Sequence, residues 1–341
     1  MVPVLLDVDT GVDDALAILL AVRHPGCQVL GITCVAGNTD VDQVVTNTLL
    51  VLDAAGAGQL PVARGAERPL IEPPRTARHV HGEDGMGDLG LPVTHRHPVG
   101  GTALELAARL LTEAREPVTL VPTAPLTNIA LLVRAYPRLV AEKVARIVLM
   151  GGSAGGGNAS PVAEFNVWHD PEAAAIVLGA GVPVTMYGLD VFYAPTLDGA
   201  DATTLMDAGD PGASLAGRLV RHQMARFGRT GATLGDAGAV AAVLDPAGVR
   251  TERRPVTVEL AGASTRGQTV VDRRTWAGDM DHDPPHQVGM RPVPVDVALE
   301  VDADRYRRLF LHALLGGAPL GGALPGDAPL GGVAAPGCAA P

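Results

Sequence analysis

The sequence predicts an α/β protein with a Rossmann-like core, in which helices flank a largely parallel central sheet. Short apolar runs of strand length alternate with segments of helical periodicity over roughly the first 190 residues. A chain of 341 residues with 47% hydrophobic residues, spread along its length, is large enough to bury a substantial core.

The first strand–turn–helix unit gives the strongest signal. Residues 2–7 form an apolar run, a glycine-containing turn follows, and residues 13–24 carry apolar side chains at helical spacing. Asp13 and Asp14 lie in the first helical turn, where carboxylates interact favourably with the helix dipole. A Pro-Gly pair ends this helix, and residues 27–35 form the second predicted strand.

The same alternation predicts the remaining elements. Apolar runs bounded by turn residues predict strands at 62–64, 118–122, 145–150, 182–186, 256–260, 268–272 and 293–301. Helical spacing predicts helices at 42–54, 104–113, 171–178, 203–227, 237–244 and 305–315. We interpret 256–260 and 268–272 as a hairpin-type pair, and the Gly-, Pro- and His-rich segment 65–98 as loops around a site.

No internal repeat or convincing linker interrupts the chain before residue 316, so residues 1–315 are expected to form one domain. Residues 316–341 repeat units such as Gly-Ala-Pro-Leu-Gly-Gly and contain few bulky apolar side chains. This Gly/Pro/Ala-rich tail is therefore expected to be disordered.

Charge and composition exclude several classes of function. The formal net charge is −11 and no basic run is present, which argues against binding to nucleic acid. No apolar stretch is long enough to span a membrane, and the N-terminus lacks the features of a signal peptide. Cys27, Cys34 and Cys338 have no metal-type spacing and are interpreted as reduced thiols. A cytoplasmic protein is expected.

Four carboxylates, Asp7, Asp9, Asp13 and Asp14, lie within eight residues at a strand end and a helix start. Ligands bind at this edge of open α/β sheets, and crowded carboxylates favour a hard cation such as calcium or magnesium. The alternative is that one aspartate caps the helix and the others face solvent. An aspartyl phosphatase is a second alternative, but it needs a lysine, and the only one, Lys143, precedes a predicted buried strand.

Further motifs follow this cluster along the chain in a fixed order. They are the run 7–15, Asn38, His81-Gly82-x-Asp84-Gly85, Pro125-Leu126-Thr127-Asn128, Met150-Gly151-Gly152, Glu164-Phe165-Asn166 and Asp170-Pro171-Glu172-Ala173-Ala174. Together they resemble the inosine–uridine-type nucleoside hydrolases from residue 2 to about residue 314. The resemblance implies the nucleoside hydrolase fold and hydrolysis of the N-glycosidic bond of a ribonucleoside to ribose and a free base.

The resemblance also implies a role for each residue of the site. Calcium would be bound by Asp9, Asp14, the Thr123 carbonyl and Asp236, and Asp9 would also accept the proton of the attacking water. Asp13, Asn38 and Asn166 would hold the 2′- and 3′-hydroxyls. Asn158 and Glu164 would reach the 5′-hydroxyl, with Met150 nearby. Such polar contacts predict poor activity on 2′-deoxynucleosides. A homodimer or homotetramer is expected.

Several of these residues also have a simpler interpretation. Asn38 could adopt a left-handed turn conformation, as asparagine often does. Glu164 and Asn166 flank Phe165, so strand-like alternation would point both to one face, as a site requires; polar residues at the surface explain the pattern equally well. His81 lies in a Gly-rich loop and could face either a base pocket or solvent. His169 is expected at the surface or behind the site, and the patch Met280-Asp281-His282-Asp283, with His286, is interpreted as solvated.

One position departs from the family pattern. Purine-capable members often carry a histidine immediately before the distal metal aspartate, whereas this chain has Gly235 before Asp236. Glycine has no proton to give, so His81 is the first candidate for assisting the leaving base and His222 the second. Base preference stays open, and a riboside-binding protein with little turnover is a further alternative.

Overall fold

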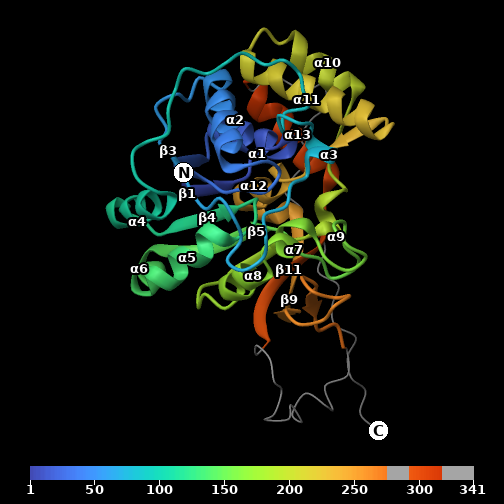
Figure 1. Cartoon of the computed structure of the whole chain (residues 1–341). Coiled ribbons are helices and arrows are strands. Elements are labelled where there is room, and N and C mark those ends of the chain that lie inside the picture. Colours follow the sequence, from blue (N-terminus) through green and yellow to red (C-terminus); the bar gives the residue numbers. More distant parts are fainter. Residues whose placement is uncertain (275–291, 317–341) are drawn as a thin grey trace, which may run out of the picture.

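The structure is a computed structural model in which residues 1–274 and 292–316 are described. Its centre is a nine-stranded sheet with the order β10-β9-β11-β6-β5-β4-β1-β2-β3. The strands β3-β2-β1-β4-β5-β6 are mutually parallel and follow the 3-2-1-4-5-6 order of a Rossmann-like sheet. The predicted fold class is confirmed (Figure 1).

The strands of the sheet closely match the predicted ones. They are β1 (Val2–Val8), β2 (Cys27–Cys34), β3 (Val62–Arg64), β4 (Val118–Pro122), β5 (Val144–Met150), β6 (Val184–Tyr187), β9 (Val249–Val258), β10 (Thr269–Val271) and β11 (Val293–Val301). The order reverses between β1 and β4, whose carboxyl ends therefore leave a crevice between their outgoing loops.

Helices cover both faces of the sheet, each burying its own apolar cluster. One face carries α1 (Val12–Arg23), α2 (Val41–Ala54), α11 (Pro211–Phe227), α12 (Ala237–Leu244) and α13 (Ala303–Leu314). The other carries α4 (Ala103–Glu113), α5 (Thr127–Ala135), α6 (Pro137–Lys143) and α8 (Pro171–Leu178). Figure 1 shows the two layers on opposite sides of the strands.

The predicted helix 203–227 is wrong as a single element. The chain forms α10 (Gly199–Asp207), breaks, and then begins α11 at Pro211. Asp210 caps α11 by accepting a hydrogen bond from the Ala213 amide, and Pro211 occupies the first helical position. A proline at that position favours a helix start and cannot continue a preceding helix.

Short elements near the carboxyl edge of the sheet were not predicted. They are α3 (Arg78–His81), α7 (Phe165–His169), α9 (Leu189–Phe192) and a two-stranded antiparallel sheet of β7 (Thr196–Asp198) and β8 (Gly231–Thr233). Helices α5 and α6 were also missed. Helices of four or five residues, such as α3, α7 and α9, show too few turns for apolar periodicity to be recognised.

The predicted hairpin-type pair is confirmed, because β10 pairs antiparallel with β9. Strand β9 is longer than predicted and also pairs antiparallel with β11, extending the parallel core at one edge. The patch around Met280 and the tail 317–341 lie outside the described residues. Across the described ranges, no helix is long and apolar enough to cross a membrane.

Candidate active site

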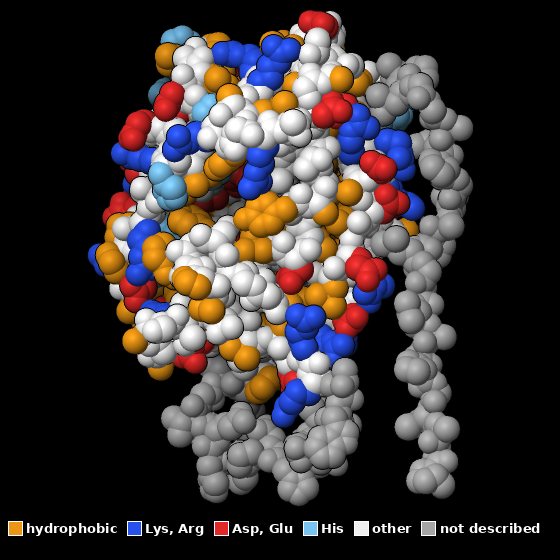
Figure 2. Space-filling view, turned by 90° about the vertical axis from the view of Figure 1, so that its right-hand side faces the viewer, with side chains coloured by type: hydrophobic (Ala, Val, Ile, Leu, Met, Phe, Trp, Pro, Cys, Tyr) orange, Lys and Arg blue, Asp and Glu red, His pale blue; other side chains and the backbone are white. Residues whose placement is uncertain are grey.

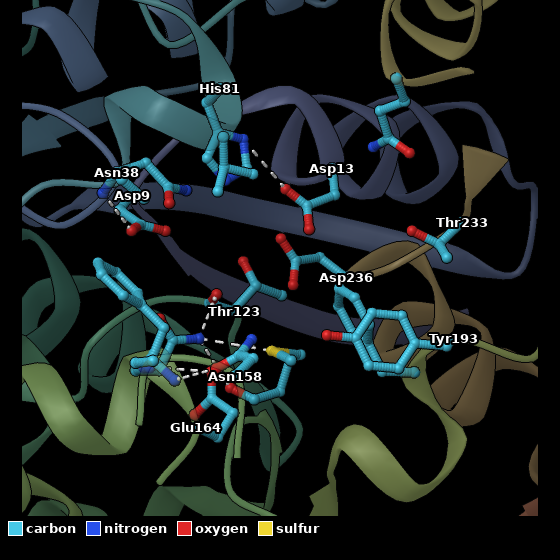
Figure 3. A pocket seen from close by; sticks show the side chains of 18 of the residues that line it. Asp9, Asp13, Asn38, His81, Thr123, Asn158, Glu164, Tyr193, Thr233 and Asp236 are labelled. Carbon is cyan, nitrogen blue, oxygen red and sulfur yellow. Dashed lines mark hydrogen bonds and ion pairs between the residues drawn. The ribbon is translucent and has the colours of Figure 1, made fainter. Parts of the chain in front are cut away.

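A cavity of about 390 Å³ opens at the carboxyl edge of the sheet, where β1 and β4 diverge. It is lined by every predicted site residue except Asp14 and His222. Figure 3 shows carboxylates, amides and His81 converging on one space from several elements. The lining residues with predicted roles are Asp9, Asp13, Asn38, His81, Thr123, Met150, Asn158, Glu164, Asn166 and Asp236.

The turn from β1 into α1 sets the acidic floor of the cavity. Asp9 follows β1 directly, and its Oδ2 accepts a hydrogen bond from the backbone amide of Asn38 at 2.7 Å. Asp14 closes the first turn of α1 by accepting from the Gly11 amide at 2.9 Å, so it does cap the helix. Its other oxygen accepts from the Thr123 hydroxyl at 2.8 Å, which links α1 to the end of β4.

These carboxylates are buried together without a balancing positive charge among their described neighbours. Burial and repulsion between neighbouring carboxylates raise the pKa of Asp9 and of Asp236 well above the usual range. Burial raises the pKa of Asp13 and of Asp14 to about 6. Oδ1 of Asp13 is buried and accepts no hydrogen bond from described residues.

This environment fits a hard cation. One oxygen each from Asp13, Asp14 and Asp236 lie within 4.8 Å of one another, a spacing that a single ion with oxygen ligands can bridge. The grouping differs from the ligand set implied by the resemblance, because it includes Asp13 in place of Asp9. The acidic cluster can hold a metal ion.

Asn166 and Glu164 form a wall beside this floor. The side-chain amide of Asn166 donates a hydrogen bond to the Thr123 carbonyl at 3.0 Å and another to the Met150 carbonyl at 3.1 Å. Glu164 caps α7 and accepts from the amides of Asn166, Val167 and Gly152. Burial raises the Glu164 pKa to about 7. The strand-like alternation predicted here is therefore wrong: both residues are buried at a helix start, and neither is a surface group.

His81 is buried and reaches the cavity from α3, so the solvent-exposed alternative does not hold. Its Nδ1 accepts a hydrogen bond from the Val12 amide at 3.2 Å, which leaves the ring proton on Nε2. Nδ1 also lies 3.7 Å from Asp13 Oδ1, but burial lowers the His81 pKa to about 4. A neutral ring makes no ion pair there, and we take the amide as the partner of Nδ1.

Other predicted positions lie away from the cavity or differ from expectation. His222 is not among the lining residues, because its ring packs against Gly87. His169 is fully buried against the edge of Phe165, so it is not a surface group. Asn38 does not have the left-handed backbone conformation, and its side chain donates to Asp14. Lys143 donates to the Ala114 carbonyl and does not line the cavity, which disfavours the phosphatase.

Aromatic and polar side chains complete the cavity, and sequence reasoning missed them. They are Arg75, Trp168, Phe192, Tyr193, Gln223, Phe227, Arg229 and Thr233. The Arg75 guanidinium lies 4.0 Å from the centre of the Trp168 ring and donates to the Trp168 carbonyl. Gln223 and Phe227 come from the end of the long helix α11, and the others come from short elements and loops, where the sequence carries no periodic signal for an inward direction.

Gly235 has a backbone conformation that excludes a side chain. Its φ is +56°, in the left-handed region, and a Cβ atom there would lie 2.8 Å from Asp13 Cβ and 3.1 Å from Phe192 Cζ. The space beside Asp236 is therefore already filled by Asp13 and the Phe192 ring.

A buried acidic cavity at the switch point of an α/β sheet is the arrangement of a small-molecule enzyme site. The chain belongs to the inosine-uridine preferring nucleoside hydrolase family, whose sequence profile matches residues 4–308. It is therefore an N-ribosyl hydrolase that acts on ribonucleosides.

Named relatives agree with this assignment. The pyrimidine-specific ribonucleoside hydrolase RihA of Citrobacter koseri is 43% identical over 275 residues, covering 79% of this chain and 88% of that protein. A purine-preferring ribonucleoside hydrolase from Gardnerella vaginalis superposes with a TM-score of 0.82 at 29% identity, covering 92% of this chain and 98% of that one. An inosine-guanosine nucleoside hydrolase also gives a TM-score of 0.82, at 30% identity, covering 94% of this chain and 100% of that one.

The surface agrees with a small-molecule substrate. Figure 2 shows acidic and basic side chains intermixed on the face it presents, without a continuous basic patch.

Proposed function

We propose that the protein is a calcium-dependent ribonucleoside hydrolase that releases ribose and a free base. The observation that carries this proposal is the buried cluster of Asp13, Asp14 and Asp236 beside Asp9, in a cavity that also presents amides and a buried histidine. Carboxylate and carbonyl oxygens are the donors that calcium prefers. A bound calcium ion would supply positive charge that lowers the pKa of a nearby water and would hold ribose hydroxyls.

The residues around this cluster support recognition of the sugar. We assign the 2′- and 3′-hydroxyls to Asp13, Asn38 and Asn166, because all three are polar and line the cavity together with Asp9. Asn158, Glu164 and Met150 also line the cavity and are assigned to the 5′ end. A sugar lacking a hydroxyl would leave these buried groups unpaired, which supports selection of ribose over 2′-deoxyribose.

The reaction we propose breaks the C1′–N bond, and its electron pair leaves with the base. A water oxygen bonds to C1′, and Asp9 accepts the proton of that water. Asp9 is suited to this role because its carboxylate lines the cavity and is held in place by the Asn38 backbone amide at 2.7 Å. The carboxylates of the floor stabilise the positive charge that develops on the sugar ring.

His81 assists the departing base in this proposal as a neutral hydrogen-bond donor. Its Nδ1 is occupied by the Val12 amide, so its Nε2–H group is the one available to the base. The low pKa of His81 keeps the ring neutral, and the base then takes its proton from solvent. His222 is left out of this proposal because its ring packs against Gly87 outside the cavity.

Pyrimidine ribonucleosides are the substrates we propose first. The relatives named pyrimidine-specific are 43% identical to this chain, whereas the structural neighbours named for purines are 29% and 30% identical. We further propose that the enzyme acts in the cytoplasm as a homodimer or homotetramer. Light scattering after size-exclusion chromatography measures that assembly directly.

A reducing-sugar assay tests the function. Uridine, cytidine, inosine and 2′-deoxyuridine are compared in calcium, in magnesium and after chelation, with Asp9→Asn as the inactive control. We expect ribose release from at least one ribonucleoside, loss on chelation, restoration by calcium, and little release from 2′-deoxyuridine. Tight binding of ribonucleosides without ribose release from any of them would instead favour the riboside-binding alternative.

A further inference from the structure

Tyr193 lines the cavity although no predicted role covers it. It follows α9 directly, and its ring packs edge-on against Phe192, with ring centroids 5.0 Å apart and an interplanar angle of 85°. Figure 3 shows its hydroxyl directed into the pocket, on the side of Asn158 and across from His81. The side chain is 46% exposed and therefore lies at the mouth of the cavity.

Asn158 fixes how the Tyr193 hydroxyl is used. Oδ1 of Asn158 accepts a hydrogen bond from the Phe165 amide at 2.9 Å, so its amide nitrogen must point the other way. The interaction with Asn158 lowers the pKa of the Tyr193 phenol, as expected when this nitrogen faces the Tyr193 oxygen as a donor. The Tyr193 oxygen thus serves as an acceptor, and its own proton is left to donate. Within the described ranges no protein acceptor takes this proton.

Glu164 is an assigned group with acceptor capacity at this end, and its charge acts on the Tyr193 phenol. Both of its oxygens already accept from the backbone amides at the start of α7 and from Gly152, which hold the carboxylate in place. A ribose 5′-hydroxyl can donate to such an oxygen, but it also needs a donor for its own lone pairs. Burial raises the pKa of the Tyr193 phenol above its usual range, so the phenol stays protonated at neutral pH.

We propose that the Tyr193 hydroxyl donates a hydrogen bond to the ribose 5′-oxygen and makes the enzyme selective for ribosides that carry one. This inference rests on the proposed function of the same cavity, and it adds a specificity-determining residue at the 5′ end. Tyr193 confers this selectivity because the bound sugar displaces water from the cavity mouth. A 5′-deoxyriboside then leaves the phenol proton of Tyr193 without an acceptor.

A cycle of enzyme and substrate changes tests the proposal. The kcat/KM values of uridine and 5′-deoxyuridine are measured for the wild-type enzyme and for Tyr193→Phe, which keeps the ring and its contact with Phe192. We expect the variant to lose roughly three- to tenfold with uridine, the range for one neutral hydrogen bond near solvent. With 5′-deoxyuridine the variant and the wild type should agree within about twofold, so the preference for the 5′-hydroxyl shrinks by the same factor.

Tyr136→Phe is the matched control, because Tyr136 is similarly exposed at 39% but lies between α5 and α6, outside the cavity lining. Tyr136→Phe should leave kcat/KM unchanged for both substrates. An equal loss of kcat/KM for both substrates with Tyr193→Phe would overturn the proposal, since it would assign Tyr193 a purely structural role. Tyr193→Met provides the same cycle if the phenylalanine variant does not fold. Absence of uridine hydrolysis by the wild type would instead count against the proposed function itself.

Discussion

Replacing Gly235 with alanine should destabilise the protein and damage the acidic floor of its site. Alanine would have to adopt a φ of +56°, which costs about 1–2 kcal/mol for a residue with a Cβ atom. The new Cβ would also lie 2.8 Å from Asp13 Cβ and 2.9 Å from Asp13 Oδ2, closer than real Cβ atoms approach. Relieving such overpacking costs a further 1–3 kcal/mol or so, because Asp13 or the Phe192 ring must move.

Gly228→Ala separates the two contributions. Gly228 also has a left-handed backbone, with φ of +59°, but nothing lies within 4 Å of its added Cβ. Urea unfolding in calcium should therefore show about 1–2 kcal/mol of destabilisation for Gly228→Ala and about 2–5 kcal/mol for Gly235→Ala. Since Asp13 moves only in the second variant, kcat/KM for a ribonucleoside should fall at least about tenfold there and stay near wild type in the control. Equal destabilisation and equal activity of the two variants would refute the steric argument.

Three further predictions concern the charges of the site. Burial raises the pKa of Asp13 and Asp14 from 3.8 to about 6, so the folded state favours their protonated forms. In the presence of a chelator, the contribution of these two groups to the free energy of unfolding should therefore be highest at about pH 4 and below. It should then fall as pH rises from about 4 to about 6 and level off above that, because the unfolded state ionises first. Calcium should remove the fall in urea titrations, and a flat profile in chelator would contradict the assignment. Asp9→Asn should lower kcat by about 10²–10⁴-fold with its fold intact by circular dichroism, because the amide cannot accept the water proton. A variant retaining more than about a tenth of wild-type kcat would show that another base acts. His81→Gln keeps an N–H donor and should retain more kcat/KM for uridine than His81→Ala, while p-nitrophenyl riboside, with its good leaving group, should be hydrolysed similarly by both. If the glutamine variant is as slow as alanine on uridine, His81 transfers a proton and is more than a hydrogen-bond donor.

Most of the fold follows from signals that the sequence expresses strongly. Buried parallel strands such as β1 and β5 are continuous apolar runs, and helices such as α4 are long enough to show their apolar face. The break between α10 and α11 was missed because apolar spacing continues across it. The Asp210-Pro211 pair that starts the second helix is visible in the sequence and should have outweighed that spacing. The short elements α3, α7 and α9 contain four or five residues each, too few for any period to appear.

The acidic floor was predictable for a topological reason. Residues that follow parallel strands meet at one edge of the sheet, so Asp9 after β1 and Thr123 after β4 had to lie close together. Asp236 could not be placed in this way, because it follows a short strand of a separate sheet. Its place came from the resemblance to the family, and the structure puts it within 4.8 Å of Asp13 and Asp14.

The end of the cavity that faces the base depends on packing that no local pattern encodes. In the sequence, Gly235 stands where related enzymes often carry a histidine that can donate a proton. In the structure, Asp13 and Phe192 fill the space that a side chain at this position would need. A side chain at position 235 would therefore have to displace Asp13 or the Phe192 ring, and the proposed assistance to the leaving base is assigned to His81 instead. The Val12 backbone amide that fixes the His81 tautomer belongs to the same turn of α1 that supplies Asp13 and Asp14. In the proposed mechanism, one helix start thus determines both the charge around the sugar and the direction of the hydrogen bond offered to the base.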